Sequence, residues 1–327
     1  MTHSAKWPWR LSALALLTVL CFGFALRVGA ASLDWSIALR DASSVHRAVM
    51  QARGARVILG ALTGASLAAA GCAFQALLRN PLGDPFALGV SGGAALGATV
   101  VVLVGATAPF WLPLGAFVGA LGAALAVVLL ARLGGSMDAR GMLLAGVVLN
   151  TATSAMLSLL RSALPGGRAE RTLSLLLGTI GEESMGTVAL VAGFAIPGWI
   201  ALMILSKSMN LLSLGADSAA SLGLSVRRAE LWLFAVGSLV VGAVVSVCGL
   251  VPFVGLVAPH YARAWVGGDH RVLLPASALV GASLVLVADA GARGAYALLG
   301  TEVPVGALTA LVGAPFLLVA LRAKSHT

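Results

Sequence analysis

Charged residues are scarce in this sequence. Only 10% of its 327 residues are Asp, Glu, Lys or Arg, whereas soluble domains carry roughly 25%. Hydrophobic residues make up 59%, and apolar runs close to the roughly 20 residues that cross a bilayer recur along the whole chain. These features exclude a soluble globular fold. We predict an all-α polytopic membrane protein.

A nucleotide-binding loop is absent from the sequence. Such a loop places Gly directly before a Lys, so that backbone amides and the ammonium group hold the phosphates together. None of the three lysines follows a glycine: Lys6 and Lys324 follow Ala, and Lys207 follows Ser. This chain is therefore predicted not to hydrolyse ATP, and any ATP must be handled by another chain.

Carboxylates are few within the apolar runs, and metal-ligand patterns are missing. Ten of the 12 acids are interpreted as loop residues, and Asp289 and Glu302 lie near the outer ends of the last two runs. An ion-coupled carrier usually has carboxylates inside its spans, so this class is disfavoured. Cys21, Cys72 and Cys248 show no paired spacing and are interpreted as small buried hydrophobic residues. No metal site is predicted.

Ten apolar segments are bounded by charged or turn residues. They lie near residues 11–29, 57–78, 86–105, 111–132, 142–162, 187–206, 231–250, 251–266, 272–292 and 303–321. The eighth is short and broken by Pro252 and Pro259, and such a segment is stable at membrane depth only when it is packed inside protein. The polar stretches 32–56, 163–186 and 207–230 are predicted to be loops. Residues 1–327 are thus expected to form one transmembrane domain.

Two features of the composition concern packing and partners. The chain has 40 glycines, and small residues allow membrane helices to approach closely. Its net charge of +9 is spread as single arginines between apolar runs. This pattern does not predict nucleic-acid binding, and membrane lipid is the expected surrounding of these charges.

The stretch VGLVAPHYAR, residues 254–263, combines Pro259, His260 and Arg263 in an apolar part of the chain. A metal site needs three or four converging ligands, and no Ser or Cys motif accompanies His260 as a nucleophile. A membrane enzyme that uses His260 and Arg263 remains an alternative, but the pattern favours a structural or conformational role.

Two further polar features have both a functional and a structural interpretation. Asn150, Ser154 and Ser158 recur every four residues and so form one stripe on a helix; they line a path or supply interhelical hydrogen bonds. Asn80, Pro81 and Leu82 follow an apolar run, where a proline stops a helix or shapes the inner mouth of a path.

Three blocks of the sequence resemble the FecCD-type permeases, the membrane subunits of ATP-binding-cassette (ABC) importers for vitamin B12, ferric siderophores and haem. The first is residues 52–98, which include RNPLGDP; the second is SLGADSAASLGLSVRR, residues 213–228; the third runs from GLVAPHYAR to the EVPVGALTALVGAPF stretch. The resemblance implies about ten spans per subunit and a homodimer with the substrate path on its two-fold axis. It also implies two copies of an ATPase, which hold ATP and magnesium, and a periplasmic binding protein.

The resemblance assigns roles to individual residues. It implies that Asn80, Pro81 and Leu82 close the inner end of the path and that the span with Asn150, Ser154 and Ser158 lines it. Outer arginines would meet acidic residues of the binding protein, and contact with lipid headgroups is the alternative; the matching positions are Arg53, Arg56 and Arg293. The loop at about 207–230 would dock the ATPase, through Gly215, Ala216, Ala219, Leu222, Gly223 and Arg227.

The sequence therefore predicts a permease in the bacterial inner membrane that moves an iron chelate (haem or a ferric siderophore) or cobalamin from periplasm to cytoplasm. An ion-coupled secondary transporter is the main alternative, and the membrane enzyme is less favoured. No cofactor is expected on this chain itself.

Overall fold

The computed structural model describes residues 7–29, 34–41, 44–106, 110–135, 138–163 and 177–324, and regular structure within these ranges is helical. The elements in chain order are α1 (Trp7–Arg27), α2 (Trp35–Arg40), α3 (Val45–Leu78), η2 (Pro85–Leu88), α4 (Val90–Val104), α5 (Trp111–Leu133), α6 (Ala139–Ala163), α8 (Met185–Ile204), α9 (Ser206–Leu212), α10 (Ala216–Ser221), α11 (Val226–Cys248), α12 (Val254–Val266), α13 (His270–Leu299) and α14 (Val305–Lys324).

Each of the ten apolar segments expected from the sequence corresponds to a helix, and the all-α membrane fold is confirmed. Among the described residues, seven helices are long and apolar enough to cross a membrane: α1, α3, α5, α6, α8, α11 and α13. Helix α4 has 15 residues and α12 has 13, and the stretch Val305–Pro315 of α14 is a shorter apolar segment.

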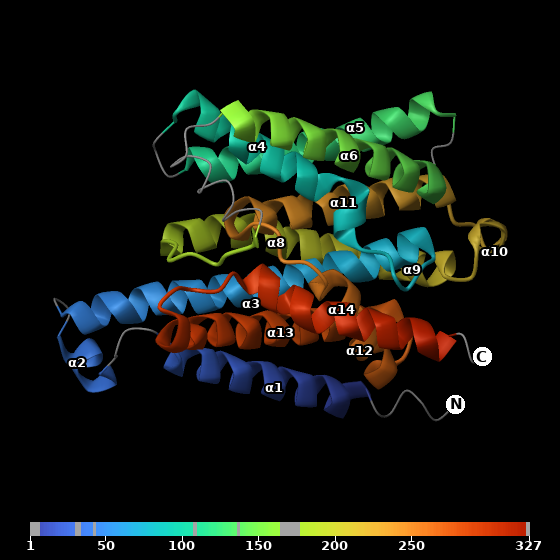
Figure 1. The fold of residues 1–327 in the computed structure, drawn as a ribbon. Helices are drawn as coiled ribbons and strands as arrows, with labels where there is room; N and C mark the ends of the chain where they lie inside the picture. Colours follow the sequence, from blue (N-terminus) through green and yellow to red (C-terminus); the bar gives the residue numbers. More distant parts are fainter. Residues whose placement is uncertain are drawn as a thin grey trace.

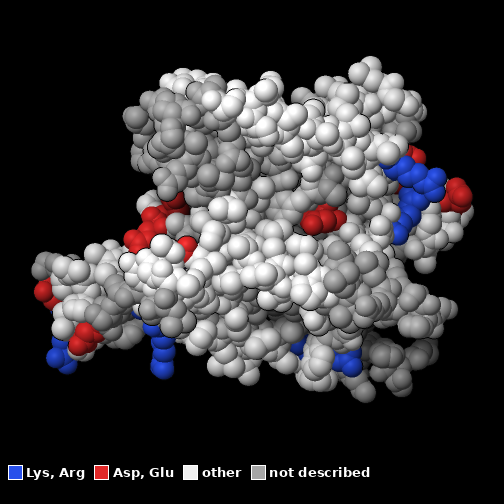
Figure 2. Space-filling model, viewed as in Figure 1, with Lys and Arg blue, Asp and Glu red and all other residues white. Residues whose placement is uncertain are grey.

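The long helices run roughly along a common direction (Figure 1). Helix α10 lies at one extremity of the bundle, where α1 begins and α14 ends, and α2 lies at the opposite one. We call these the α10 end and the α2 end. Charged side chains visible on one face gather mostly towards these two ends, with uncharged residues between them (Figure 2). A bilayer favours this distribution, because charges in its hydrocarbon core are costly.

Helix α3 forms the centre of the bundle. The apolar window of α3 is 83% buried, compared with 6% for α1, and α3 packs against α8, α11, α12 and α13. Two glycines permit the closest of these contacts. A Cβ atom on Gly64 would collide with the carbonyl oxygen of Gly281 in α13, and one on Gly71 would collide with that of Gly255 in α12.

Two stretches predicted as loops are largely helical, so those predictions were wrong. Helix α3 begins at Val45, inside the stretch 32–56, and α9 and α10 lie within 207–230. Helices α3 and α10 have a local signal where they start in polar sequence. The Ser44 hydroxyl caps α3 by accepting the Arg47 N–H, and Gly215 precedes α10 with a φ of +103°. Most of 163–186 lies outside the described residues.

The eighth apolar segment is interrupted around Pro252, as the sequence suggested, but not at Pro259. The interruption covers residues 249–253, where Gly249 and Phe253 have φ of +67°, and Pro252 lies within it. Pro259, in contrast, lies inside the continuous helix α12. A proline removes the N–H that would bond to the carbonyl four residues earlier, here Gly255. The side chain of Gln75 in α3 donates to this carbonyl (3.4 Å) and to that of Leu256 (3.4 Å), which explains why Pro259 is tolerated.

Candidate functional site: two polar ends and a groove

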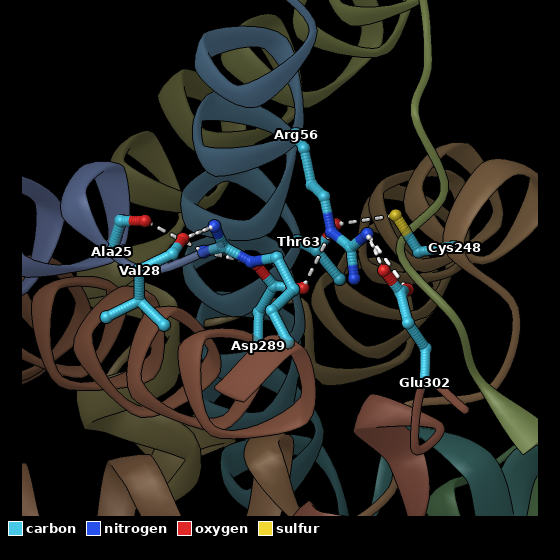
Figure 3. Close-up of polar contacts among 8 residues, drawn as sticks. Ala25, Val28, Arg56, Thr63, Cys248, Asp289 and Glu302 are labelled. Atoms are coloured by element: carbon cyan, nitrogen blue, oxygen red, sulfur yellow. Dashed lines mark hydrogen bonds and ion pairs between the residues drawn. The ribbon is translucent and has the colours of Figure 1, made fainter. Parts of the chain in front are cut away.

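A buried carboxylate organises the α2 end. Asp289 in α13 is completely buried and its two oxygens accept from two arginines (Figure 3). Oδ1 accepts from Nε of Arg56 at 3.0 Å, and Oδ2 accepts from Nε of Arg293 at 3.0 Å and lies 3.0 Å from Nη2 of the same residue. Arg56 Nη1 also pairs with Glu302 at 3.0 Å. Each charge therefore has an opposite charge in contact, which is the condition for burying ions in an apolar bundle.

The same arginines hold the end of α1. Arg293 donates to the carbonyl of Val28 and, at 2.9 Å, to that of Ala25. Arg53 donates to the carbonyl of Leu26 at 3.2 Å. The last carbonyls of a helix have no intrahelical partner, and cationic donors stabilise that terminus. Helix α1, which buries little apolar surface, is thereby joined to α3 and α13.

The arginines predicted to dock a binding protein are not loop residues. Arg53 and Arg56 belong to α3 and Arg293 to α13, and their exposed fractions are 8%, 5% and 4%. This corrects their predicted location. They line a cavity of about 320 Å³ together with Glu182 and Glu302. A role in docking stays a prediction.

The expected gate segment begins where α3 ends. Arg79 ends α3 in the left-handed conformation, with φ of +49°, and the Asn80 side chain accepts the N–H of Leu82 at 3.0 Å. Arg79 pairs at 2.7 Å with Glu230 of α11. The carboxyl of Asp84, further along, accepts the N–H of Phe86 at 3.1 Å, and burial raises the pKa of Asp84 to about 6.

The positions of two acids change the reason for disfavouring an ion-coupled carrier. Glu230 was interpreted as a loop residue, but it lies in α11 with its side chain 2% exposed. Asp289, which was expected near the outer end of its span, lies inside α13. Carboxylates therefore do occur in the spans. Both carboxylates form ion pairs with arginines, which indicates a structural role rather than ion binding.

The polar stripe of α6 meets a groove of about 470 Å³. Asn150 and Ser154 line this groove together with Phe86, Pro252 and Gly306. The Asn150 amide lies 3.5 Å from the carbonyl of Phe86. Ser158 does not line the groove; it is exposed and donates to the carbonyl of Ser154 at 3.1 Å. The structure thus brings together Asn150 and Ser154, but not Ser158.

The predicted coupling residues surround the short helix α10. Gly215 and Gly223 have φ of +103° and +84°, and the N–H of Gly223 bonds to Ala220 while that of Leu224 bonds to Ala219, as in a left-handed helix cap. Leu222 is 61% exposed. Ala219 is fully buried within this chain, and its role in ATPase docking stays a prediction.

The other two coupling residues face a cavity at this end. Ala216 and Arg227 line a space of about 550 Å³, together with Arg79, Asp138 and Glu230. The predicted gate and the predicted coupling segment are therefore neighbours, joined through the Arg79–Glu230 pair.

The stretch that raised the enzyme alternative is part of the scaffold. Arg263 donates to the side-chain oxygen of Gln75 at 3.1 Å, and the rings of His260 and Tyr261 are in edge contact, 6.3 Å apart. Among the described residues, no group of three or more His, Cys, Asp or Glu could hold a metal ion. The sequence analysis missed Gln75, although a lone amide in the Ala-rich run 65–77 is an available signal.

The shared carboxylate leads to a prediction about stability. Asp289→Asn keeps the shape of the side chain but removes the anion that contacts buried Arg293 and leaves Arg56 with Glu302 alone, a loss on the order of 3–5 kcal/mol. Glu302→Gln removes a partner whose side chain is 46% exposed, and such pairs contribute about 1 kcal/mol or less. Thermal unfolding of the detergent-solubilised variants should show a large decrease for Asp289→Asn only. Equal decreases would contradict this description of the cluster.

The comparisons with known proteins agree with this architecture. The model of the FecCD transport family matches residues 16–323. The hemin transport system permease protein HmuU of Yersinia pestis is 37% identical over 319 residues, covering 93% of this chain and 92% of HmuU. The cobalamin import system permease protein BtuC of Halobacterium salinarum is 40% identical over 268 residues, covering 82% of this chain and 71% of BtuC.

A solved structure extends the agreement to three dimensions. It is described as an inward-facing conformation of a metal-chelate type ABC transporter, and its chain superposes with a TM-score of 0.86 at 29% identity, covering 97% of this chain and 99% of that one. The family model and the relatives span nearly the whole sequence rather than one motif. The chain belongs to the FecCD transport family of membrane permeases.

Proposed function

We propose that this chain is the permease subunit of an ATP-driven importer that moves an iron chelate (haem or a ferric siderophore) or cobalamin across the inner membrane. The observation that carries the proposal is the match over nearly the full length to permeases named for hemin and cobalamin, together with a fold shared with a metal-chelate type transporter. A homodimer would place the groove beside Asn150 and Ser154 at a path between two copies.

Energy for transport would come from a separate ATPase. The sequence has no P-loop, so ATP and magnesium would be held by two copies of that partner, with no cofactor on this chain. The α10 end offers a docking surface for it: α10 is short, fixed between Gly215 and Gly223, and presents exposed Leu222. A rigid protrusion of this kind can transmit a movement of the partner to the adjacent Arg79 and gate segment.

Replacement of one exposed leucine tests this coupling. We predict that the chain alone hydrolyses no ATP and that its ATPase co-purifies with it. Leu222→Glu should reduce the recovered ATPase at least tenfold, because the change buries an unpaired charge in the interface. Val45→Glu is the control, since Val45 is 78% exposed at the α2 end. Equal ATPase recovery with both variants would refute docking through α10.

Cysteine accessibility tests the path. In a variant without Cys21, Cys72 and Cys248, cysteines at positions 150 and 154 should react with a water-soluble thiol reagent in at least one nucleotide state. A cysteine at Ser277, which is fully buried outside the groove, serves as the unreactive control. Protection of both groove positions in every state would favour hydrogen bonding between helices as the role of this stripe.

The arginine cavity at the α2 end is proposed to receive a carboxylate of a periplasmic binding protein. Arg53 is the arginine to test, because a change of Arg56 or Arg293 would also remove a partner of the buried Asp289. Arg53→Glu should weaken docking at low salt, and an opposite charge swap on the binding protein should partly restore it. Arg40→Glu, on exposed α2, is the control. If Arg53→Glu and Arg40→Glu bind alike, the arginines are interfacial residues.

A further inference from the structure

A small polar cavity at the α10 end has no role in the transport functions described above. Its volume is about 260 Å³, well above the roughly 10–15 Å³ that a single water needs. It lies where α3, α9, α12 and α13 meet. The polar residues that line it are Gln75, Arg79, Asn80, Ser213, Arg263 and His270.

The charge of this cavity distinguishes it from the others at the two ends. Among the described residues that line it, two are arginines and none is acidic, whereas the cavities beside Arg56 and Arg227 each include two acids. Arg79 pairs with Glu230, but the hydrogen bond of Arg263 goes to the neutral Gln75. The cavity therefore has an excess of positive charge.

The imidazole of His270, one of the lining residues, contains an acceptor beside this cavity. Asn210 donates its amide to the carboxylate of Asp269 at 2.7 Å, and this fixes which side-chain atom of Asn210 is oxygen. That oxygen accepts the backbone N–H of His270 at 2.9 Å and lies 2.7 Å from Nδ1. Nδ1 must therefore carry a proton, and in the neutral ring Nε2 carries a lone pair.

The lone pair at Nε2 is unused by the protein. His270 is 4% exposed, and no group in the described part of the chain forms a hydrogen bond with Nε2. Buried polar atoms are rarely left without a partner. A negative charge on a ligand would match the guanidiniums of the cavity, and an O–H group that enters beside the imidazole would give Nε2 a donor.

We propose that this cavity binds a phosphate group that carries or adjoins a hydroxyl, either as free hydrogen phosphate or as the headgroup of an anionic lipid. Guanidinium groups bind phosphate oxygens with strong, charge-assisted hydrogen bonds. The bound anion would link Arg79, next to the Asn80–Leu82 segment, to Ser213, just before α10. It would thereby join the predicted gate to the predicted coupling helix.

Inorganic phosphate tests the site directly. Its binding to the purified full-length chain in a phosphate-free buffer is measured by calorimetry, with sulfate as the comparison, because sulfate has no O–H at neutral pH. Phosphate should bind more tightly than sulfate, and Arg263→Gln should weaken phosphate binding at least tenfold. Arg271→Gln is the matched control: it removes an equal charge from an exposed residue outside the cavity. Equal binding of phosphate and sulfate would overturn the role of Nε2.

A second pair of variants tests the site even if Arg263→Gln misfolds. A comparison of two lipids distinguishes free phosphate from a lipid headgroup as the ligand. Ser213 is exposed, so Ser213→Asp introduces a repelling charge at the mouth without disturbing the core, and Ser213→Asn is its neutral control. Thermal stability is measured with free phosphate, and in nanodiscs of phosphatidylglycerol or phosphatidylcholine. Stabilisation by phosphate that is lost only in Ser213→Asp supports a soluble ligand. Stabilisation by phosphatidylglycerol but not by phosphatidylcholine, again lost only in Ser213→Asp, supports a lipid headgroup as the ligand. If neither treatment separates Ser213→Asp from Ser213→Asn, or Arg263→Gln from Arg271→Gln, the proposal is wrong.

Discussion

The carboxylate of Asp289 is the interaction on which the arrangement of helices at the α2 end depends. A charge in an apolar bundle is tolerated only when an opposite charge and hydrogen bonds compensate it. Here one carboxylate compensates two guanidiniums, and those guanidiniums use their remaining donors on Glu302 and on the carbonyls of Ala25 and Val28. Helices α1, α3 and α13 and the segment before α14 are thus joined by one network (Figure 3). Loss of the Asp289 carboxylate therefore leaves uncompensated positive charge in this network.

Helix α3 connects this network to the opposite end of the molecule. Its 34 residues span about 50 Å at roughly 1.5 Å per residue. Arg53 and Arg56 lie towards one end, and Gln75 lies near the other, with Arg79 immediately after the helix. Between them, Gly64 and Gly71 allow the backbones of α13 and α12 to approach within contact distance. The element that holds the α2 end is therefore also the one that supports Pro259 in α12 and the Arg79–Glu230 pair beside α10.

Much of the fold followed from hydropathy alone, because apolar runs and their polar boundaries are local properties of the chain. All ten expected segments are helices. The errors arose where polar residues are helical: the start of α3 and the helices α9 and α10 depend on caps and tertiary packing that hydropathy does not report. For the site, motif similarity indicated the arginines but not their partners. The spacing of Asp289 and Arg293, four residues apart, was a local signal that they share a helix face. The contacts of Arg56 with Asp289, and of Gln75 with Gly255, join residues at least 180 positions apart, so only the folded structure shows them.

The central claim is that this permease moves a metal chelate at the expense of ATP. Its most direct test is uptake into proteoliposomes that contain the chain with its ATPase and binding protein, using haem, a ferric siderophore and cobalamin as cargo. The account predicts accumulation of one of these chelates that requires ATP and that a proton or sodium gradient alone does not drive. Accumulation driven by an ion gradient in liposomes that contain this chain alone would contradict it.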